Sequence, residues 1–382
     1  MKEGVIGILG LGAMGQIIAK DLHDSFKGKV VYLVRNPSSI KEIAKKYRAE
    51  VRIVDISKPE SLVKAFKGID VIIHAVHHEF NVRVMEACLE ANCHYVDLGG
   101  LFHFTREQLK LNEEFKRKRL TAVIGMGASP GITNVLAKYG AQGLEKVEAV
   151  QIRIGMKDFS KYKRVSPLSA SYSLQTLLEE FSWKPAVWKN GKMVFVEPLS
   201  GREPYVFPKP IGKQKPQYTI HSELATLPFT LRAKNVSFKI AFDDDFVEKV
   251  MLLKRLGLTK DEEIEIKHNK INIKSFLVEV LKQLPKSIPK KIEQYEIIRV
   301  VVKGIKEKKS KTIILDTKIH SVNETIDKET GVPPSIVAQF ILSNQIKERG
   351  VFPPELIIPA ESFFKELTKR KIFIFQNNKR IN

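Results

Sequence analysis

Cysteine is scarce in this sequence: only Cys88 and Cys93 occur among 382 residues. No disulfide framework can therefore hold the fold together, and two isolated thiols fit a reducing compartment. No stretch approaches the roughly 18 unbroken apolar residues of a membrane span. Residues 4–19 come nearest to a signal sequence, but five glycines interrupt them, as a strand–turn–helix requires and a signal peptide does not. We expect a cytoplasmic protein without a membrane partner.

Negative charge is also in short supply, since 64 Lys and Arg face 43 Asp and Glu and leave a net charge of +21. Arginine, the residue that suits phosphate clamps, contributes only 16 of these cations. The 48 lysines are spread along the chain without interleaved aromatic residues. We therefore expect no specific nucleic-acid partner, whereas an anionic small molecule would be attracted.

Length and patterning predict two kinds of domain. A chain of 382 residues exceeds the roughly 250–300 residues of a single core. The first 125 residues alternate short β-branched runs with amphipathic stretches, as in a Rossmann doubly wound parallel sheet of the α/β class. The predicted strands cover residues 5–9, 30–34, 51–54, 71–75, 95–98 and 121–124, and the predicted helices cover 14–25, 40–47, 58–66, 81–91 and 105–118.

The pattern changes after Gly131. The strands become longer and more alternating, which predicts an α+β second domain with an open antiparallel sheet. Beyond residue 325 helical patterns return. The expected elements are a hairpin of 296–304 with 311–322, a Pro- and Lys-rich loop over 201–216, a helix over 333–348 that Pro333 opens, and a helix over 361–369.

A glycine-rich turn follows the first predicted strand and opens the first predicted helix. Gly10, Gly12 and Gly15 form the pattern G-x-G-x-x-G, with Ala13 and Met14 between them. In this context the first glycine permits a tight turn, the second lets main-chain amides approach a pyrophosphate, and the third lets the helix pack on the strand. The helix N-terminus adds a partial positive charge. We expect these five residues to bind a dinucleotide.

The residue that ends the second predicted strand indicates which dinucleotide. An NAD enzyme usually places a carboxylate here, but this chain has Arg35, 20 residues after Gly15. A guanidinium can pair with the 2′-phosphate of NADP, which a carboxylate would repel. Asn36 and Ser38 supply further donors on the same loop. The sequence therefore predicts NADP as the preferred coenzyme and NAD as the alternative.

The remaining coenzyme contacts are expected at the carboxyl ends of the other parallel strands, where ligands of such sheets bind. Asp55 follows the third strand and is expected near the adenine. Ala75 and Val76 follow the fourth strand, and Gly99 follows the fifth. Their small side chains would let the nicotinamide lie close to the main chain.

Several sequence blocks resemble one enzyme family, the saccharopine dehydrogenase-like oxidoreductases, and within it the lysine 6-dehydrogenases most. The blocks are residues 10–15, 75–81, 94–100, 127–134, 172–174 and 350–355. The resemblance implies NAD or NADP bound to the N-terminal domain and oxidation or reduction of a C–N bond of an amino acid or polyamine. It further implies a homodimer, a dinucleotide-binding domain of residues 1–130 and 325–382, and a substrate and dimerisation domain of residues 131–324.

The proton-transfer group is expected near the end of the fifth strand. Asp97 is the first candidate, because it could accept the substrate ammonium and then its proton; alternatively, it caps the following loop. His77, His78 and His103 are candidate proton shuttles, since imidazole titrates near neutrality. Their spacing matches no zinc pattern, and hydride transfer needs no metal, so we expect no metal.

Substrate contacts are expected from the second domain and its border. Asn134 follows Pro130 and Gly131 and either holds the substrate or caps a helix. The other candidates line the predicted cleft or, alternatively, are satisfied polar residues of the second domain. They are Tyr172, Ser173, His221 and Glu223.

Three functional hypotheses follow. The first is an NAD(P)-dependent oxidoreductase acting on the C–N bond of lysine or a lysine-derived amino acid. The second is a polyamine enzyme similar to carboxynorspermidine dehydrogenase, and the third is an NADP-binding sensor without turnover. An electropositive cleft would favour a substrate with several carboxylates, whereas an acid-lined cleft would favour a polyamine.

Overall fold

The structure is a computed structural model that describes residues 4–168, 173–323 and 327–382. Its first sheet has seven parallel strands in the order β20-β6-β5-β4-β1-β2-β3. This is the Rossmann order, extended by a strand from the C-terminal segment. The strands are β1 (Val5–Leu9), β2 (Lys29–Val34), β3 (Glu50–Ile53), β4 (Val71–His74), β5 (His94–Asp97), β6 (Thr121–Val123) and β20 (Gly350–Phe352).

The predicted Rossmann domain is confirmed. Its central strands β1, β4, β5 and β6 are almost wholly buried, because helices cover both faces of the sheet and near-continuous apolar runs pack against them. One predicted helix, 105–118, is wrong in its bounds, since a turn divides it into two. The helices and 3₁₀ turns are α1 (Ala13–Ser25), η1 (Pro37–Ile40), α2 (Lys41–Tyr47), α3 (Pro59–Phe66), η2 (His78–Phe80), α4 (Asn81–Ala91), α5 (Leu101–Leu109) and α6 (Asn112–Arg117).

The second sheet has nine strands in the described ranges. The expected hairpin is confirmed and forms its centre, but the sheet is mixed and not purely antiparallel, because β14 runs parallel to β7. Its strands are β7 (Lys146–Asp158), β9 (Ala186–Lys189), β10 (Lys192–Phe195), β13 (Gln217–Tyr218), β14 (Asn235–Ile240), β18 (Glu293–Lys306), β19 (Lys309–Val322), β21 (Phe373–Gln376) and β22 (Lys379–Arg380).

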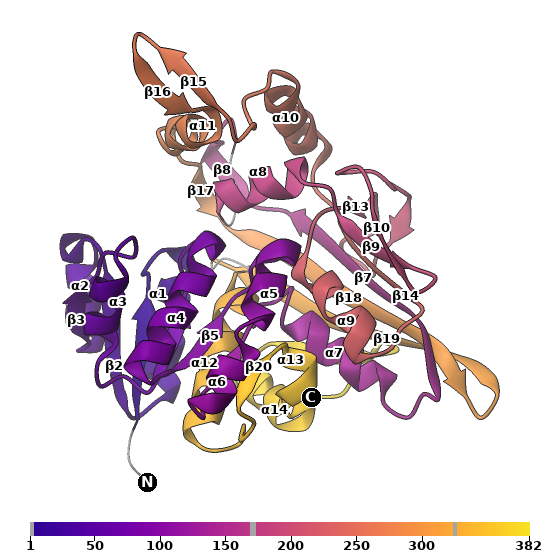
Figure 1. The fold of residues 1–382 in the computed structure, drawn as a ribbon. Helices are drawn as coiled ribbons and strands as arrows, with labels where there is room; N and C mark the ends of the chain where they lie inside the picture. The colour runs from indigo at the N-terminus through magenta and orange to yellow at the C-terminus, as the bar shows by residue number, and fades with distance from the viewer. Residues whose placement is uncertain (1–3, 169–172, 324–326) are drawn as a thin grey trace.

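Smaller elements complete the second part of the chain. The tract 201–216, expected as a loop, contains a two-stranded ribbon, and α8, α10 and α11 share a small apolar core at the far end of the sheet (Figure 1). These elements are α7 (Ile132–Ala141), β8 (Lys161–Arg164), α8 (Leu174–Ser182), β11 (Tyr205–Val206), β12 (Lys213–Gln214), η3 (Ser222–Ala225), α9 (Leu227–Thr230), α10 (Asp244–Arg255), β15 (Glu263–Ile266), β16 (Asn269–Asn272), α11 (Ile273–Lys282) and β17 (Ile288–Lys291).

The C-terminal segment serves both sheets. It contains α12 (Lys328–Leu342), α13 (Pro354–Ile357) and α14 (Ala360–Lys369). β20 extends the first sheet, whereas β21 pairs with β19 in the second. A domain boundary at residue 325 stays a prediction. The pairing of β21 with β19 differs from that boundary, because it places part of the C-terminal segment in the second sheet, where the apolar β21 covers the edge of β19.

The predicted start of α12 is wrong. Pro333 was expected in the first turn, but the helix begins at Lys328, so Pro333 and Pro334 lie inside it. Proline removes a main-chain hydrogen bond and usually ends a helix. Here the helix is buried on most sides and packs against α1, β4 and β5. Tertiary packing therefore offsets the two missing bonds. None of the helices in the described ranges has the length and apolar character to cross a bilayer.

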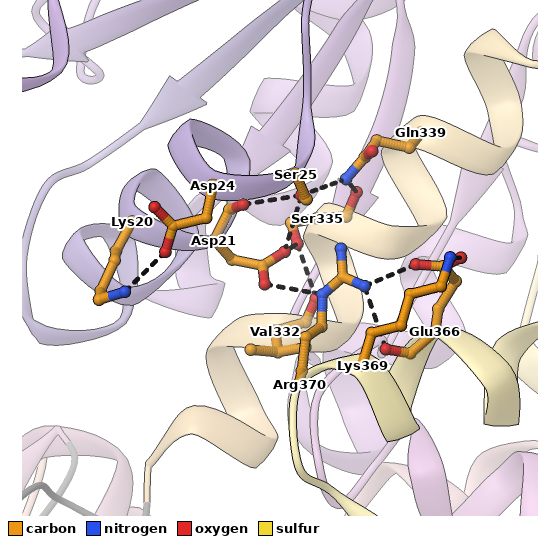
Figure 2. A network of polar contacts seen from close by, with 10 residues as sticks. All are labelled: Lys20, Asp21, Asp24, Ser25, Val332, Ser335, Gln339, Glu366, Lys369 and Arg370. Atoms are coloured by element: carbon orange, nitrogen blue, oxygen red, sulfur yellow. Dashed lines mark hydrogen bonds and ion pairs between the residues drawn. The ribbon is translucent and has the colours of Figure 1, made fainter. Parts of the chain in front are cut away.

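A buried ion-pair network joins α1, α12 and α14 (Figure 2). Arg370 donates to Asp21 Oδ1 at 2.7 Å and to Glu366 Oε2 at 2.6 Å. Ser335 Oγ on α12 donates to the other oxygen of Asp21. The Asp21 and Arg370 side chains are only 8% and 10% exposed, so the network anchors the C-terminal segment to the nucleotide-binding domain.

We expect Arg370→Met to lower the free energy of unfolding by about 3–5 kcal/mol, because it leaves the Asp21 carboxylate buried without its cation. Lys369→Met is the matched control. Lys369 contacts the same Glu366 at 2.6 Å but is 69% exposed, so its loss should cost at most about 1 kcal/mol. Urea unfolding of both variants measures the difference, and equal losses would contradict a dominant role for the buried pair.

Candidate active site

A cavity of about 530 Å³ opens at the carboxyl ends of β1, β2 and β3. Its walls come from the turn after β1, the loop after β2 and the end of β3. The lining residues are Leu9, Gly10, Leu11, Gly12, Leu33, Val34, Arg35, Asn36, Ser39, Ile40, Val54, Ile56, Val76 and Phe80. Apolar side chains around a glycine turn, with a guanidinium at one end, suit the adenosine and pyrophosphate of a dinucleotide.

The three glycines have different constraints. Gly10 has a φ of +92°, and a Cβ there would lie 2.5 Å from Val76 Cγ2. A Cβ on Gly15 would lie 2.0 Å from the Gly10 carbonyl oxygen, so the helix can pack on the turn only with glycine. A Cβ on Gly12 would meet nothing within 4 Å. Gly12 is the N-cap of α1 and has no side-chain cap, so the helix N-terminus is open toward a phosphate.

Some polar residues of the loop after β2 line the cavity, and others form hydrogen bonds within the loop. Arg35 and Asn36 line the cavity. The Asn36 side chain also accepts a bond from Ser38 N at 3.0 Å and caps η1. Ser38 does not line the cavity, whereas the neighbouring Ser39 does. Ser39 is expected from the sequence as a further donor on this loop, and a coenzyme contact of Ser39, as of Ser38, stays a prediction.

Asp55 has a local role in this geometry. Its Oδ1 accepts bonds from Ser57 N at 3.0 Å and Ser57 Oγ at 2.6 Å. These bonds, with the nearby cations Lys58 and Arg35, hold the pKa of Asp55 below its ordinary value. The cavity is lined by its neighbours Val54 and Ile56 and not by Asp55 itself, so an adenine contact of Asp55 stays a prediction.

Asp97 is held by four donors and does not face a cleft. Oδ1 accepts the N–H groups of Gly99 at 2.8 Å and Gly125 at 2.6 Å. Oδ2 accepts Tyr95 Oη at 2.8 Å and Gln108 Nε2 at 2.5 Å. The residue is 1% exposed, and burial raises its pKa. This geometry favours the alternative role of Asp97, a cap that fixes the loops after β5 and β6, and a proton-transfer role for Asp97 stays a prediction.

The loops fixed by Asp97 approach each other closely. Gly99 has a φ of +127°, and a Cβ there would lie 2.8 Å from Pro130 Cγ. Gly99 therefore brings the loop after β5 against the loop 127–131. Ala75 lies behind the glycine turn, with its carbonyl oxygen 3.1 Å from the position of a Cβ on Gly10.

His77 and His78 meet a carboxylate from the other part of the chain. His78 Nε2 lies 2.9 Å from Glu179 Oε2 on α8, and His77 Nε2 lies 3.6 Å from the same oxygen. The two imidazole rings lie 4.0 Å apart. Burial lowers the pKa of His78, and although burial alone would raise the pKa of Glu179, the two imidazoles hold it below its ordinary value. An ionised carboxylate thus faces two imidazoles where the domains meet.

A lysine and a second carboxylate lie next to the cluster of His77, His78 and Glu179. Lys274 Nζ lies 3.3 Å from Glu179 Oε1 and 2.7 Å from Asp261 Oδ2. The donor atoms of His77, His78 and Glu179 lie within 4.8 Å of one another and could hold a metal ion. A nicotinamide-dependent reaction needs no metal, however, and the absence of a catalytic metal stays a prediction.

His103 lies apart from that cluster, although it was predicted with it. It is exposed on α5, stacks on Phe195 at 6.1 Å and lies edge-on to Trp183. Burial of part of its ring and the charge of Arg106 lower its pKa. His103 therefore belongs to an aromatic wall, and a proton-transfer role for it stays a prediction.

His221 and Glu223 form a buried pair against the loop 127–131. His221 Nδ1 lies 2.7 Å from Glu223 Oε2, and its ring stacks on Phe238 at 3.7 Å. Glu223 Oε1 accepts bonds from Ser129 Oγ at 2.5 Å and Thr133 Oγ1 at 2.8 Å. Burial disfavours the imidazolium, but the Glu223 charge outweighs it and raises the pKa of His221. The pair ties the second domain to the first.

Asn134 caps α7, one of its two predicted roles. Its Oδ1 accepts the Gly131 N–H at 3.0 Å, and its Nδ2 donates to Glu355 Oε2 at 2.8 Å. Ser173 caps α8 by accepting from Thr176 N at 3.3 Å. Tyr172 lies outside the described residues. Substrate contacts of these three residues stay predictions.

Sequence reasoning missed the partners that complete these clusters, namely Glu179, Lys274 and Glu355. Glu179 follows His78 by 101 residues and Glu355 follows Asn134 by 221 residues. No local spacing links such pairs. The sequence offered one signal for these partners: Glu179 and Glu180 occupy positions of an amphipathic helix pattern that are buried in the structure.

Two family models match nearly the whole chain. The saccharopine dehydrogenase NADP binding domain matches residues 6–123, and the saccharopine dehydrogenase C-terminal domain matches residues 127–372. The chain belongs to the saccharopine dehydrogenase family. This member is therefore an NAD(P)-dependent oxidoreductase, and the family resemblance and the coenzyme expected from the sequence are confirmed.

Individual relatives also match most of the chain. The chain is 24% identical to carboxynorspermidine synthase of Vibrio cholerae over 351 residues, which cover 87% of this chain and 83% of the relative. It is also 24% identical to carboxyaminopropylagmatine dehydrogenase of Synechocystis, with 92% of each chain covered. The structure of saccharopine dehydrogenase (L-Glu forming) from Saccharomyces cerevisiae matches the fold with a TM-score of 0.74 at 17% identity, over 99% of this chain and 100% of that one.

We expect Arg35→Glu to weaken NADPH binding by about tenfold or more and NADH binding much less, because a carboxylate would repel the 2′-phosphate. Fluorescence titration with both coenzymes measures this ratio. Lys45→Glu on α2 is exposed and lines no part of the cavity, so it makes the same charge change as a control. A parallel loss of both affinities in Arg35→Glu would contradict recognition of the 2′-phosphate.

We expect Asp97→Asn to lower the free energy of unfolding by about 1–3 kcal/mol, since an amide would turn an N–H toward donors that now bond a carboxylate. Denaturant unfolding measures the loss. Asp24→Asn, at a side chain 54% exposed on α1, should be nearly neutral. A large fall in kcat with unchanged stability would restore Asp97 as the proton acceptor.

Proposed function

We propose that this oxidoreductase acts on the C–N bond of a carboxylated polyamine. The observation that carries the proposal is the junction of His77, His78 and Glu179, where imidazoles that follow a strand of the coenzyme sheet meet a carboxylate of the second domain. The order and spacing of parallel strands put this junction on the nicotinamide side of the glycine turn.

The reaction needs a hydride and a proton. When bound, the coenzyme supplies a hydride to the carbon of a C=N bond, or accepts one from the carbon of the C–N bond. The nitrogen gains a proton in the first direction and loses one in the second. We assign that proton to the imidazoles of His77 and His78, with the Glu179 carboxylate favouring the charged form of His78.

The charge around the junction supports a cationic substrate. In a chain with a net charge of +21, buried carboxylates gather at the domain border and bond mainly to neutral donors. Glu223 accepts hydroxyls of Ser129 and Thr133, and Glu355 accepts the Asn134 amide and the Thr230 hydroxyl. An acidic border favours a polyamine over a substrate with several carboxylates.

The relatives support the same substrate class, since two of them are named for carboxynorspermidine and carboxyaminopropylagmatine. The polyamine alternative therefore takes precedence over the lysine-derived substrate. Two of the arginines that could bind extra carboxylates contact acidic side chains: Arg153 Nη2 lies 3.6 Å from Glu203, and Arg202 pairs with Asp244.

The direct test is an activity panel. Purified protein is incubated with NADP or NAD and with carboxynorspermidine, saccharopine or lysine, and the reduced coenzyme is followed at its absorbance. We expect turnover with carboxynorspermidine and NADP. Turnover with saccharopine alone would restore the amino-acid substrate, and tight NADPH binding without turnover on any amine would favour the sensor.

We expect Glu179→Gln to move the high-pH limb of the imine-reducing activity down by about one pH unit. The limb reports loss of the imidazolium that donates the proton, and removal of the neighbouring anion lowers the imidazole pKa. Glu79→Gln is the control, because Glu79 lies 3.5 Å from His77 Nδ1 but is 47% exposed. An unshifted limb in Glu179→Gln would contradict the proton route.

A further inference from the structure

One buried carboxylate has no role in the chemistry or in the ties described above. Glu329 lies in the first turn of α12 and is 1% exposed. Among the described residues neither of its oxygens has a hydrogen-bond partner. Asp97, Glu223 and Glu355 are as deeply buried, but donors surround each of them. An unpaired carboxylate at this depth is costly unless a ligand supplies donors.

The first turn of α12 lies beside the coenzyme-binding elements. A Cβ on Gly331 would lie 3.4 Å from the Met14 carbonyl oxygen in α1. A Cβ on Gly127, in the loop after β6, would lie 3.4 Å from Thr330 Cγ2. Glu329 directly precedes these two contact residues, so it lies beside α1 and the loop after β6.

A second carboxylate faces the same place from the second sheet. Glu296 is half-buried on β18, and the alternation of the strand puts it on the side of Ile298, Val300 and Val302. That side packs against α7, toward the nucleotide-binding domain. Glu296 and Glu329 lie near enough to repel each other, and Asp327 adds to the negative charge while Lys328 offsets part of it.

Burial and the charge of Asp327 raise the pKa of Glu296 to about 8, and burial and the charge of Glu296 raise the pKa of Glu329. Lys328, the next residue on the helix, offsets part of the negative charge around Glu329. A bound ammonium would supply three donors and one positive charge to these two carboxylates.

We propose that Glu296 and Glu329 form the subsite for a second protonated amine of the substrate, separate from the nitrogen that reacts. The inference rests on the proposed function and deepens it, because it states how a diamine is distinguished from a monoamine. No bond forms or breaks at this subsite. A lysine-like amino acid, whose second amine adjoins a carboxylate, would be repelled there.

Binding measurements test the subsite without turnover. The NADP-loaded protein is titrated calorimetrically with norspermidine, 1,3-diaminopropane and propylamine. We expect the diamine to bind at least about tenfold more tightly than the monoamine. Glu329→Gln and Glu296→Gln should each remove most of that preference and leave NADPH affinity unchanged. Glu361→Gln, at an exposed position of α14, is the control with the same charge change.

Thermal unfolding gives an independent readout. Without amine, Glu329→Gln should raise the Tm at pH 8, because burial of a carboxyl group with a raised pKa costs stability at this pH. 1,3-Diaminopropane should raise the Tm of the wild type more than that of the variant. A higher Tm with an unchanged preference for the diamine would overturn the subsite and leave Glu329 a buried neutral acid.

The two proposals fail separately. If the wild type binds the diamine through Glu296 and Glu329 but turns over no polyamine substrate, the proposed function fails and the subsite stands. If carboxynorspermidine is oxidised with the same KM by the wild type and both variants, the function stands and the subsite is overturned.

Discussion

Most buried carboxylates in this protein accept hydrogen bonds from donors of several segments, and much of the architecture follows from that requirement. Asp97 collects donors from β5, α5 and the loop after β6. Asp21 collects them from α12 and the end of α14. Because each group needs all of its donors at once, each one fixes the relative positions of segments that are distant in the sequence.

The same constraint separates the structural carboxylates from those that face a ligand. Glu223 has hydroxyl donors on one oxygen and an imidazole on the other, so it has little capacity left for a substrate. Glu179 contacts two imidazoles and an ammonium, which suits a group that tunes a proton carrier. Glu329 has no hydrogen-bond partner within the described ranges, and its position in the first turn of a helix gives it only partial compensation from the helix dipole.

Local patterns in the sequence predict the first domain well. The periodicity of strands and helices depends on neighbours within a few residues. The glycine turn is also predictable, because Gly10 and Gly15 approach each other within one strand–helix unit. The start of α12 could not be predicted in this way, because burial against α1 overrides the proline signal at Pro333. The role of Asp97 was also nonlocal, since Gln108 and the Gly125 amide approach it only in the folded sheet.

The route of the chain limits how the two sheets can move. It passes from the first sheet to the second after β6, returns between β19 and β20, and crosses again between β20 and β21. A domain pair joined by one linker can swing open about a single pivot, but three tethers at one boundary oppose such rotation (Figure 1). The path of the chain therefore opposes any opening of the active site by rotation of one sheet away from the other.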